Sequence, residues 1–406
     1  GVGSLLTLAA LALLPRDGLG HVASVPVHRG VGSAGRVVGP HRAQRGRLWR
    51  LWASSKSAES TEAKSTTSTD MADDLYVLVH GLAGRPEDLS YLEKCLGRRD
   101  PTAVVHLARC NSGILMTFDG IRQGGSRLAC EIRGLIKRHP RLKRISLVGN
   151  SLGGLYCRYA VGLLFDERTG KLEGLSPHKF LTTATPHLGV GEYGYLSVIP
   201  GPLQSLGAYT IMGQTIRELL LKDKNSNSND GSSLPLLAEM AGLDFEPGPN
   251  TAQDTLPFLD GLRAFEERCA YANVANDFLV AYRTAHPAGP LLKPVEPKRD
   301  DSGVVFRRRV SAQDFERRDM SSKSQQPFKG RKELMDSMSY SLSSIGWEQV
   351  TVAFPGSLPL AHNKICALER DPLQTWINSA GRPVVEDQAK WLIPEQKYEP
   401  AASSRA

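Results

Sequence analysis

The sequence predicts an α/β fold with a mostly parallel central sheet and helices on both faces. Residues 75–79 form a continuous apolar run, which is typical of a parallel strand that is buried on both of its faces. Residues 103–107 predict a second strand, and a third follows at 145–148. Between these two strands, apolar residues recur at helical spacing before Pro140: Leu128, Ile132, Leu135 and Ile136. Strand, helix and strand in this order form a βαβ unit, and such units build parallel sheets.

The stretch 145–164 predicts a strand, a tight turn and a helix. The turn is Gly149-Asn150-Ser151-Leu152-Gly153, a Gly-x-Ser-x-Gly pattern. Its two glycines have no Cβ that would clash with the neighbouring strand and helix, so the serine hydroxyl can project alone from a strained backbone. The Leu152 amide and the positive helix end then lie where an oxyanion would form. We interpret the turn as a nucleophile elbow; the alternative is an ordinary structural turn.

A second signature follows the 75–79 strand directly. His80-Gly81-Leu82 matches the His-Gly pair of the α/β-hydrolase arrangement, in which this loop lends a second amide to the oxyanion hole. Here that amide would come from Leu82. A glycine is needed at this place because a side chain would occupy the space of the substrate carbonyl. We expect His80 itself to be structural.

A serine hydroxyl is a poor nucleophile at neutral pH, so it needs a histidine base and an acid that orients the histidine. In α/β-hydrolases the acid and then the histidine follow the serine, each at the carboxyl end of a strand. Asp277 comes directly after the strand predicted at 271–275 and is the best acid; its alternative role is to cap a turn. Three other acids lie inside a long insertion: Asp244, Asp254 and Asp260.

The histidine of the site is expected to be His362, which follows the last strand, predicted at 349–354. The alternative is a surface loop histidine. The other histidines after the serine precede any strand-end acid or follow Asp277 too closely: His178, His187 and His286. The predicted triad is therefore Ser151, Asp277 and His362. Arg158 and Tyr156, in the helix after the elbow, are expected to be packing or surface residues.

Two insertions interrupt the strand pattern of the domain, which we place at 71–396. From about 190 to 262, after a strand at 180–184, glycine and proline turns and a helical stretch at 210–221 replace any sheet pattern. Insertions here commonly form a cap or lid over the site in α/β-hydrolases, and the alternative is ordinary packing. The segment of about 291–344 is polar, basic and serine-rich, so we expect a flexible excursion. An amphipathic stretch at 384–392 precedes a disordered tail, 397–406.

Residues 1–70 differ in composition from the rest. A short apolar run at 5–14 is followed by seven arginines, with Asp17 the only acid before Glu59. Arginine-rich, serine-rich and acid-poor segments are typical of transit peptides, so a plastid address is our first hypothesis, with residues 54–70 as a linker. The alternatives are the apolar core of a signal peptide, a disordered tail, and a cytoplasmic, membrane-associated protein.

The net charge of +8 comes from two segments outside the predicted sheet-forming body. Segments 1–70 and 291–333 carry +5 each, which leaves −2 for the remaining body. This distribution argues against a nucleic-acid partner and favours contact with an anionic membrane surface. The six cysteines have no paired spacing, which favours buried free thiols and a reducing compartment. No apolar run is long enough to span a membrane.

The chain resembles the "Putative serine esterase" family of lipase-like α/β-hydrolases over about residues 74–393. The match rests on Val77-Leu78-Val79-His80-Gly81-Leu82, Thr117-Phe118-Asp119-Gly120-Ile121 with Arg127-Leu128-Ala129, the elbow, Ala184-Thr185-Pro186-His187-Leu188-Gly189, Tyr271-Ala272-Asn273-Val274 with Asp277, and Gly346-Trp347-Glu348 running to Ala361-His362-Asn363. The resemblance implies esterases or lipases that act on acyl esters, some of them phospholipid or monoacylglycerol-like, often near membranes or lipid droplets. One departure is Asn150, where the family usually has histidine; we expect it to alter pocket detail and not to abolish activity.

We therefore expect a serine carboxylester hydrolase that needs neither a metal nor a cofactor and acts on an acyl-ester or lipid substrate. Ser151 attacks the ester carbonyl, His362 takes its proton, Asp277 orients His362, and the Leu82 and Leu152 amides hold the oxyanion. The alternatives are a lipid acyltransferase with the same triad and a non-catalytic binding protein on a hydrolase fold.

Overall fold

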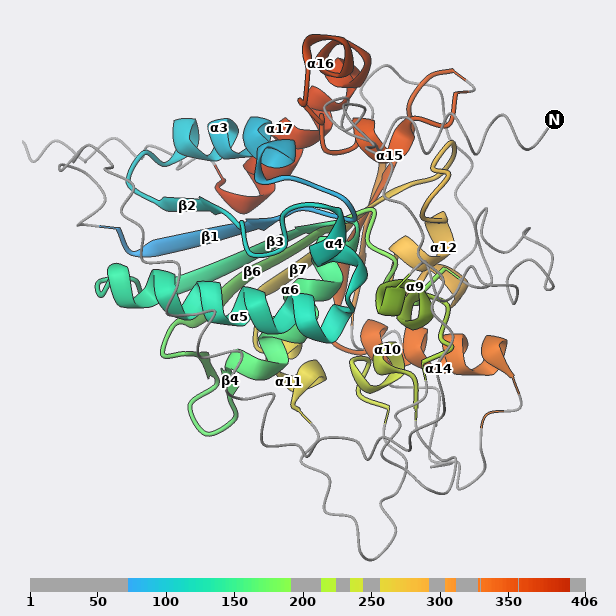
Figure 1. Ribbon diagram of the computed structural model, residues 1–406, viewed down its shortest axis with the longest axis horizontal. Helices are drawn as coiled ribbons and strands as arrows, with labels where there is room; N and C mark the ends of the chain where they lie inside the picture. The colour runs from blue at the N-terminus through green and yellow to red at the C-terminus, as the bar shows by residue number, and fades with distance from the viewer. Residues whose placement is uncertain are drawn as a thin grey trace, which may run out of the picture. The chain divides into compact units, whose positions relative to one another are not determined.

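The computed structural model describes residues 72–190, 213–223, 234–243, 256–291, 304–311, 328, 330–356 and 358–394. Its strands are β1 Asp74–Val79, β2 Val104–Leu107, β3 Arg144–Asn150, β4 Phe165–Asp166, β5 Lys171–Leu172, β6 Ser176–Thr183, β7 Glu267–Asn273, β8 Val304–Val310 and β9 Trp347–Val352 (Figure 1). Its α-helices are α3 Ser90–Arg99, α4 Ile114–Phe118, α5 Ile121–Arg138, α6 Leu152–Leu164, α9 Gly213–Leu219, α10 Leu236–Glu239, α11 Phe258–Arg263, α12 Tyr282–Ala285, α14 Arg331–Ser343, α15 Ala361–Lys364, α16 Pro372–Asn378 and α17 Arg382–Leu392. Short 3-10 helices are η3 Pro86–Leu89, η5 Gly289–Leu291 and η6 Ser379–Gly381.

The described residues form a central sheet of seven strands in the order β2-β1-β3-β6-β7-β9-β8. All neighbouring pairs are parallel except the edge pair β8 and β9, which is antiparallel. The predicted α/β-hydrolase fold, with a mostly parallel sheet and helices on both faces, is confirmed. Because every parallel strand runs the same way, the loops after β1, β3, β7 and β9 leave the sheet at one edge.

Both faces of the sheet are covered, which explains the continuous apolar run of β1. Leu75, Val77 and Val79 pack into the core that includes α5 and α6, and Tyr76 and Leu78 pack into the core that includes α3 and α17. Figure 1 shows α5 and α6 along one face and α3 and α17 along the other. Burial of each such side chain stabilises the fold by about 1.5–3 kcal/mol.

Three local differences separate the structure from the sequence prediction. Ahead of the predicted helix the structure has an additional short helix, α4, and α5 begins at Ile121, before the apolar stripe. The strand β7 ends at Asn273, so the residues after it form bends that carry Asp277. The segment expected to be a flexible excursion contains β8 and α14. The sequence prediction missed α14 because its apolar residues are spaced among serines; four of them are buried: Leu334, Met335, Met338 and Leu342.

Parts of the predicted cap insertion lie within the described residues and pack onto the body of the domain. Helix α9 contacts α4 and α5, and α11 contacts α6. The remainder of the insertion, the predicted transit peptide and linker (1–70) and the predicted tail (397–406) lie outside the described residues.

The cysteines are all free, as the sequence predicts. Four of them are buried, whereas Cys110 is partly exposed and Cys130 is exposed. No helix of the described residues is long and apolar enough to cross a membrane.

Candidate active site

The nucleophile elbow has the geometry that its glycines predict. Ser151 stands between β3 and α6 with φ of 54° and ψ of −125°, and its amide donates to the Thr183 carbonyl at 2.7 Å. A Cβ on Gly153 would lie 2.2 Å from the Val79 carbonyl oxygen, and one on Gly149 would lie 2.3 Å from the Gly154 Cα. Both positions therefore admit only glycine at this spacing. A left-handed conformation at a serine costs about 1–3 kcal/mol and is held by the surrounding structure.

The structure brings together the three side chains of the predicted triad. The His362 Nε2 lies 3.0 Å from the Ser151 Oγ, and its Nδ1 lies 3.0 Å from each carboxylate oxygen of Asp277. The loops that carry the acid and the histidine are themselves joined, because the Ala361 amide donates to the Asn276 carbonyl at 3.2 Å. All three side chains are largely buried. The arrangement can relay a proton from the serine hydroxyl to the imidazole while the carboxylate accepts from the other ring nitrogen.

Four donors surround the Asp277 carboxylate. Besides His362, the backbone amides of Leu279 and Val280 donate to Oδ1 at 3.0 and 2.9 Å, and the Asn273 side chain donates to Oδ2 at 2.8 Å. Burial by itself would raise the pKa of this carboxyl group, but His362 and these hydrogen bonds together hold the pKa below its ordinary value. The group is thus kept as an anion beside the imidazole.

The two predicted oxyanion amides belong to residues in segments that adjoin the nucleophile, α6 and the loop after β1. Leu152 is the first residue of α6, so its amide is one of those that a helix N-terminus leaves without an intrahelical partner. Leu82 follows Gly81, which packs directly against the serine: a Cβ on Gly81 would come 2.8 Å from the Ser151 Cβ and 3.3 Å from its Oγ. A larger residue at 81 would therefore crowd Ser151, and the predicted need of the substrate carbonyl for this space stays a prediction.

The other candidate histidines do not join the site. His178 pairs with Glu266 at 2.9 Å, and His80 is buried, with its Nδ1 donating to the Gly81 carbonyl. His187 and His286 are fully buried, and burial lowers the pKa of His286 to about 3. Among the alternative acids, Asp260 forms an ion pair with Arg263, and Asp244 and Asp254 lie outside the described residues.

Two polar residues near the elbow, Arg158 and Asn150, are buried and do not lie at the surface. Arg158 is fully buried and donates to the His187 carbonyl at 3.0 Å, and burial lowers its pKa to about 9. It is therefore a packing residue that holds the loop after β6. Asn150, the departure from the family pattern, is buried, and its Oδ1 has no hydrogen-bond partner within the described part of the chain.

Some residues that support the site were not predicted from the sequence. The Asn273 amide group that donates to Asp277 ends β7, and the Thr117 hydroxyl accepts from the Ala83 amide in the loop after β1. Thr117 belongs to the Thr-Phe-Asp-Gly motif, which the sequence analysis identified without assigning it a role. The motif was the available signal, but only the folded chain shows which loop it contacts.

Comparisons with known proteins identify the family to which the chain is similar. A family model described as "Putative serine esterase (DUF676)" matches residues 69–287, which is more than half of the chain. This match includes Ser151 and Asp277 and ends before His362, so the assignment of His362 depends on its contacts in the structure.

The curated relatives are longer proteins. "Putative lipase C4A8.10" from Schizosaccharomyces pombe is 30% identical over 220 residues, covering 52% of this chain and 26% of the relative. "Putative lipase ROG1" from Saccharomyces cerevisiae is 27% identical over 215 residues, covering 52% of this chain and 28% of the relative. The chain thus spans about a quarter of the length of these relatives.

Similar solved structures are distant in sequence. A protein of Listeria innocua, the product of the gene lin2722, is 11% identical with a TM-score of 0.34, covering 81% of this chain and 96% of that one. A Bacillus licheniformis lipase, BlEst2, is 13% identical with a TM-score of 0.32, covering 53% of this chain and 38% of that one.

The family model matches more than half of the residues of this chain, including the elbow and Asp277. The chain therefore belongs to the "Putative serine esterase (DUF676)" family.

Proposed function

We propose that this protein hydrolyses carboxylic esters of lipids through an acyl-enzyme formed on Ser151. The observation that carries the proposal is the unbroken line of hydrogen bonds from the Ser151 hydroxyl through His362 to Asp277 at the carboxyl edge of the sheet. Membership in a serine esterase family supports the reaction class, and the lipase names of the yeast relatives support a lipid ester as substrate.

In the acylation step the Ser151 Oγ attacks the ester carbonyl carbon, and the hydroxyl proton passes to the His362 Nε2. The carbonyl oxygen becomes an oxyanion, which accepts hydrogen bonds from the Leu82 and Leu152 amides. The positive end of α6 adds to this stabilisation. Asp277 stabilises the imidazolium and fixes its ring. His362 then returns the proton to the alcohol oxygen, which leaves while the acyl group stays on Ser151.

In the deacylation step a water molecule enters where the alcohol left. His362 removes a proton from this water, and the resulting hydroxide attacks the acyl carbonyl. The tetrahedral intermediate uses the same two amides. Its collapse releases the fatty acid and returns the proton to Ser151. Contact with a membrane surface and a plastid location, both predicted from the basic segments and residues 1–70, stay predictions.

The test is replacement of the nucleophile. Ser151→Ala should lower kcat on p-nitrophenyl butyrate and on a long-chain lipid ester by more than about 10³-fold, because the remaining site supplies only binding and oxyanion contacts. It should also abolish labelling by a fluorophosphonate probe. Ser146→Ala is the matched control, because Ser146 is a buried serine of β3, the strand that leads into the elbow. Hydrolysis that survives Ser151→Ala, with Ser146→Ala active, would refute the proposal.

A further inference from the structure

The loop after β1 has a conformation that it would not adopt alone. We define residues 80–84 as the oxyanion loop. The Gly84 amide donates to the Gly81 carbonyl at 3.1 Å, which closes a β-turn with Leu82 and Ala83 at its centre. Ala83 has φ of 50°. This position of a turn favours glycine or asparagine, because a Cβ clashes in the left-handed region. The turn therefore depends on contacts that hold Ala83.

Thr117 of α4 supplies the contact at the amide of this peptide. The Ala83 amide donates to the Thr117 Oγ1 at 3.0 Å, and this hydroxyl donates in turn to the Gly113 carbonyl at 3.3 Å. Thr117 is fully buried. On the other side, the Arg370 guanidinium donates to the Ala83 carbonyl at 3.4 Å and pairs with Asp88 at 2.7 Å. The Ala83 residue is thus held at both its amide and its carbonyl.

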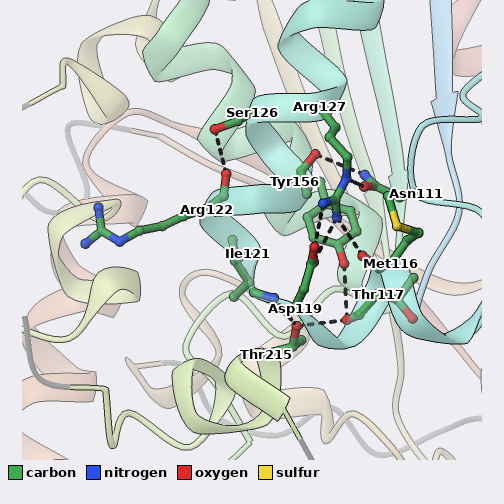
Figure 2. A network of polar contacts seen from close by, with 12 residues as sticks. Asn111, Met116, Thr117, Asp119, Ile121, Arg122, Ser126, Arg127, Tyr156 and Thr215 are labelled. Carbon is green, nitrogen blue, oxygen red and sulfur yellow. Dashed lines mark hydrogen bonds and ion pairs between the residues drawn. The ribbon is translucent and has the colours of Figure 1, made fainter. Parts of the chain in front are cut away.

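Helix α4 is fixed in turn by Arg127 of α5, as Figure 2 shows. The Arg127 guanidinium donates to the Met116 carbonyl at 2.7 Å and to both oxygens of Asp119 at 2.5 and 2.8 Å. Its Nε donates to the Asn111 side chain at 2.8 Å. A bidentate pair of this kind restrains orientation as well as distance. The motif residues Thr117, Asp119 and Arg127 therefore form one support beneath the oxyanion loop.

The predicted cap insertion reaches the same support through α9. The Thr215 hydroxyl donates to the Thr117 carbonyl at 2.8 Å and accepts from the Gly120 amide at 3.0 Å. Figure 2 shows Thr215 beside Thr117 at the junction of α4 and α5. One turn along α9, the Glu218 carboxylate accepts from the Ile121 amide. Thr215 and Glu218 are both buried, so these bonds exist only while α9 is docked.

We propose that Thr117 is a positioning residue that holds the oxyanion loop for catalysis, and that α9 acts on the loop through Thr117. The inference rests on the proposed function, since it concerns the Leu82 amide of that site. Without the Thr117 hydroxyl, the Ala83 amide loses its acceptor and the turn can relax out of the left-handed conformation. Leu82 precedes Ala83 directly, so its amide then shifts from the position where the oxyanion develops.

The experiment compares hydroxyl deletions at buried threonines. Thr117→Val and Thr117→Ala remove the hydroxyl, Thr117→Ser keeps it, and Thr351→Val is the control. Thr351 is also buried and also makes a side-chain hydrogen bond, to the Tyr282 hydroxyl at 3.0 Å, on β9. The measurements are kcat and KM on p-nitrophenyl butyrate, the rate of Ser151 labelling by a fluorophosphonate, and the melting temperature.

Thr117→Val and Thr117→Ala should each lower kcat and the labelling rate by about 10- to 100-fold with little change in KM, because complete loss of an oxyanion donor costs about 10²–10³ in kcat. Thr117→Ser should recover most of the rate. The melting temperatures should match that of Thr351→Val, which should keep wild-type kcat. Rates of Thr117→Val and Thr117→Ala equal to that of Thr351→Val would overturn the positioning role. If Thr117→Val has a lower melting temperature than Thr351→Val and Thr117→Ala does not, the kcat of Thr117→Ala is the test of the positioning role.

A second comparison tests α9. Thr215→Val removes the bond to the Thr117 carbonyl, and we expect kcat to fall about 3- to 10-fold in the same direction, with a smaller effect when Thr117→Val is already present. Full activity of Thr215→Val would overturn the action of α9 and leave the role of Thr117 standing. A wild-type protein whose Ser151 neither reacts with the probe nor supports hydrolysis would overturn the proposed function, and this inference with it.

Discussion

Replacement of Asp277 by asparagine keeps the size of the side chain and removes its charge. In the native site Oδ1 accepts from two backbone amides, those of Leu279 and Val280, while Oδ2 accepts from the Asn273 side chain. In Asp277→Asn the carbonyl oxygen should take the Oδ1 position, because an amide nitrogen there would face two donors. The new NH₂ group then points at the Asn273 amide group and at the His362 Nδ1.

We expect this arrangement to reverse the tautomer of His362: Nδ1 lies 3.0 Å from both oxygens of Asp277, but Oδ1 already accepts from two backbone amides. An NH₂ group donates to Nδ1, so the ring proton moves to Nε2, the nitrogen that lies 3.0 Å from the Ser151 Oγ. A protonated Nε2 cannot accept the serine proton. Asparagine in place of the acid of a Ser-His-Asp triad lowers kcat by about 10⁴, which corresponds to about 5 kcal/mol of transition-state stabilisation.

The assay is kcat/KM on a soluble ester at pH 7, together with the fluorophosphonate labelling rate and the melting temperature. Asp371→Asn is the matched control, because Asp371 caps α16 by accepting from the Gln374 amide at 2.9 Å, and asparagine caps equally well. The control should keep wild-type activity. If folded Asp277→Asn retains kcat/KM within tenfold of the wild type, the tautomer argument is wrong and another group orients His362.

Two further predictions concern the elbow and a buried acid. Gly153→Ala should abolish serine labelling and lower the melting temperature, because its Cβ would meet the Val79 carbonyl at 2.2 Å. The control is Gly97→Ala in α3, which has open space around the added Cβ and should stabilise the fold by about 0.5–1 kcal/mol. An active Gly153→Ala would contradict the packing argument. Burial, opposed by the bond from the Ile121 amide, raises the pKa of Glu218 from its ordinary value of 4.5 to about 7. Since the folded state then binds this proton more tightly than the unfolded state, the contribution of Glu218 to stability is largest below pH 4.5 and is lost as the pH rises through about 7, by about 3 kcal/mol at most. Glu218→Gln should therefore melt above the wild type at pH 8 and equal to it at pH 4.5, and equal melting at both pH values would contradict the burial argument.

The fold and the central site follow from local patterns in the sequence. A strand buried on both faces must be apolar throughout, as 75–79 is, and a turn as tight as the elbow must have glycine at 149 and 153. Asp277 and His362 were found from chain order, because the loops at the carboxyl edge of a parallel sheet converge. Each of these inferences uses a constraint that acts within a few residues or within one strand.

The contacts that hold the site were decided only by the tertiary structure. The Ala83 amide meets a hydroxyl 34 residues away, and the Thr117 carbonyl meets another 98 residues away, on a helix of the insertion. Threonine and asparagine donate and accept in many settings, so their type does not specify a partner. The same limit applied to the segment 291–344, where α14 and the antiparallel edge strand β8 pack against the body despite a polar composition. Local sequence patterns therefore determined which residues could react, and long-range packing determined how they are held. The reason is that a hydrogen bond between residues far apart in the sequence produces no spacing or periodicity that a sequence pattern could reveal.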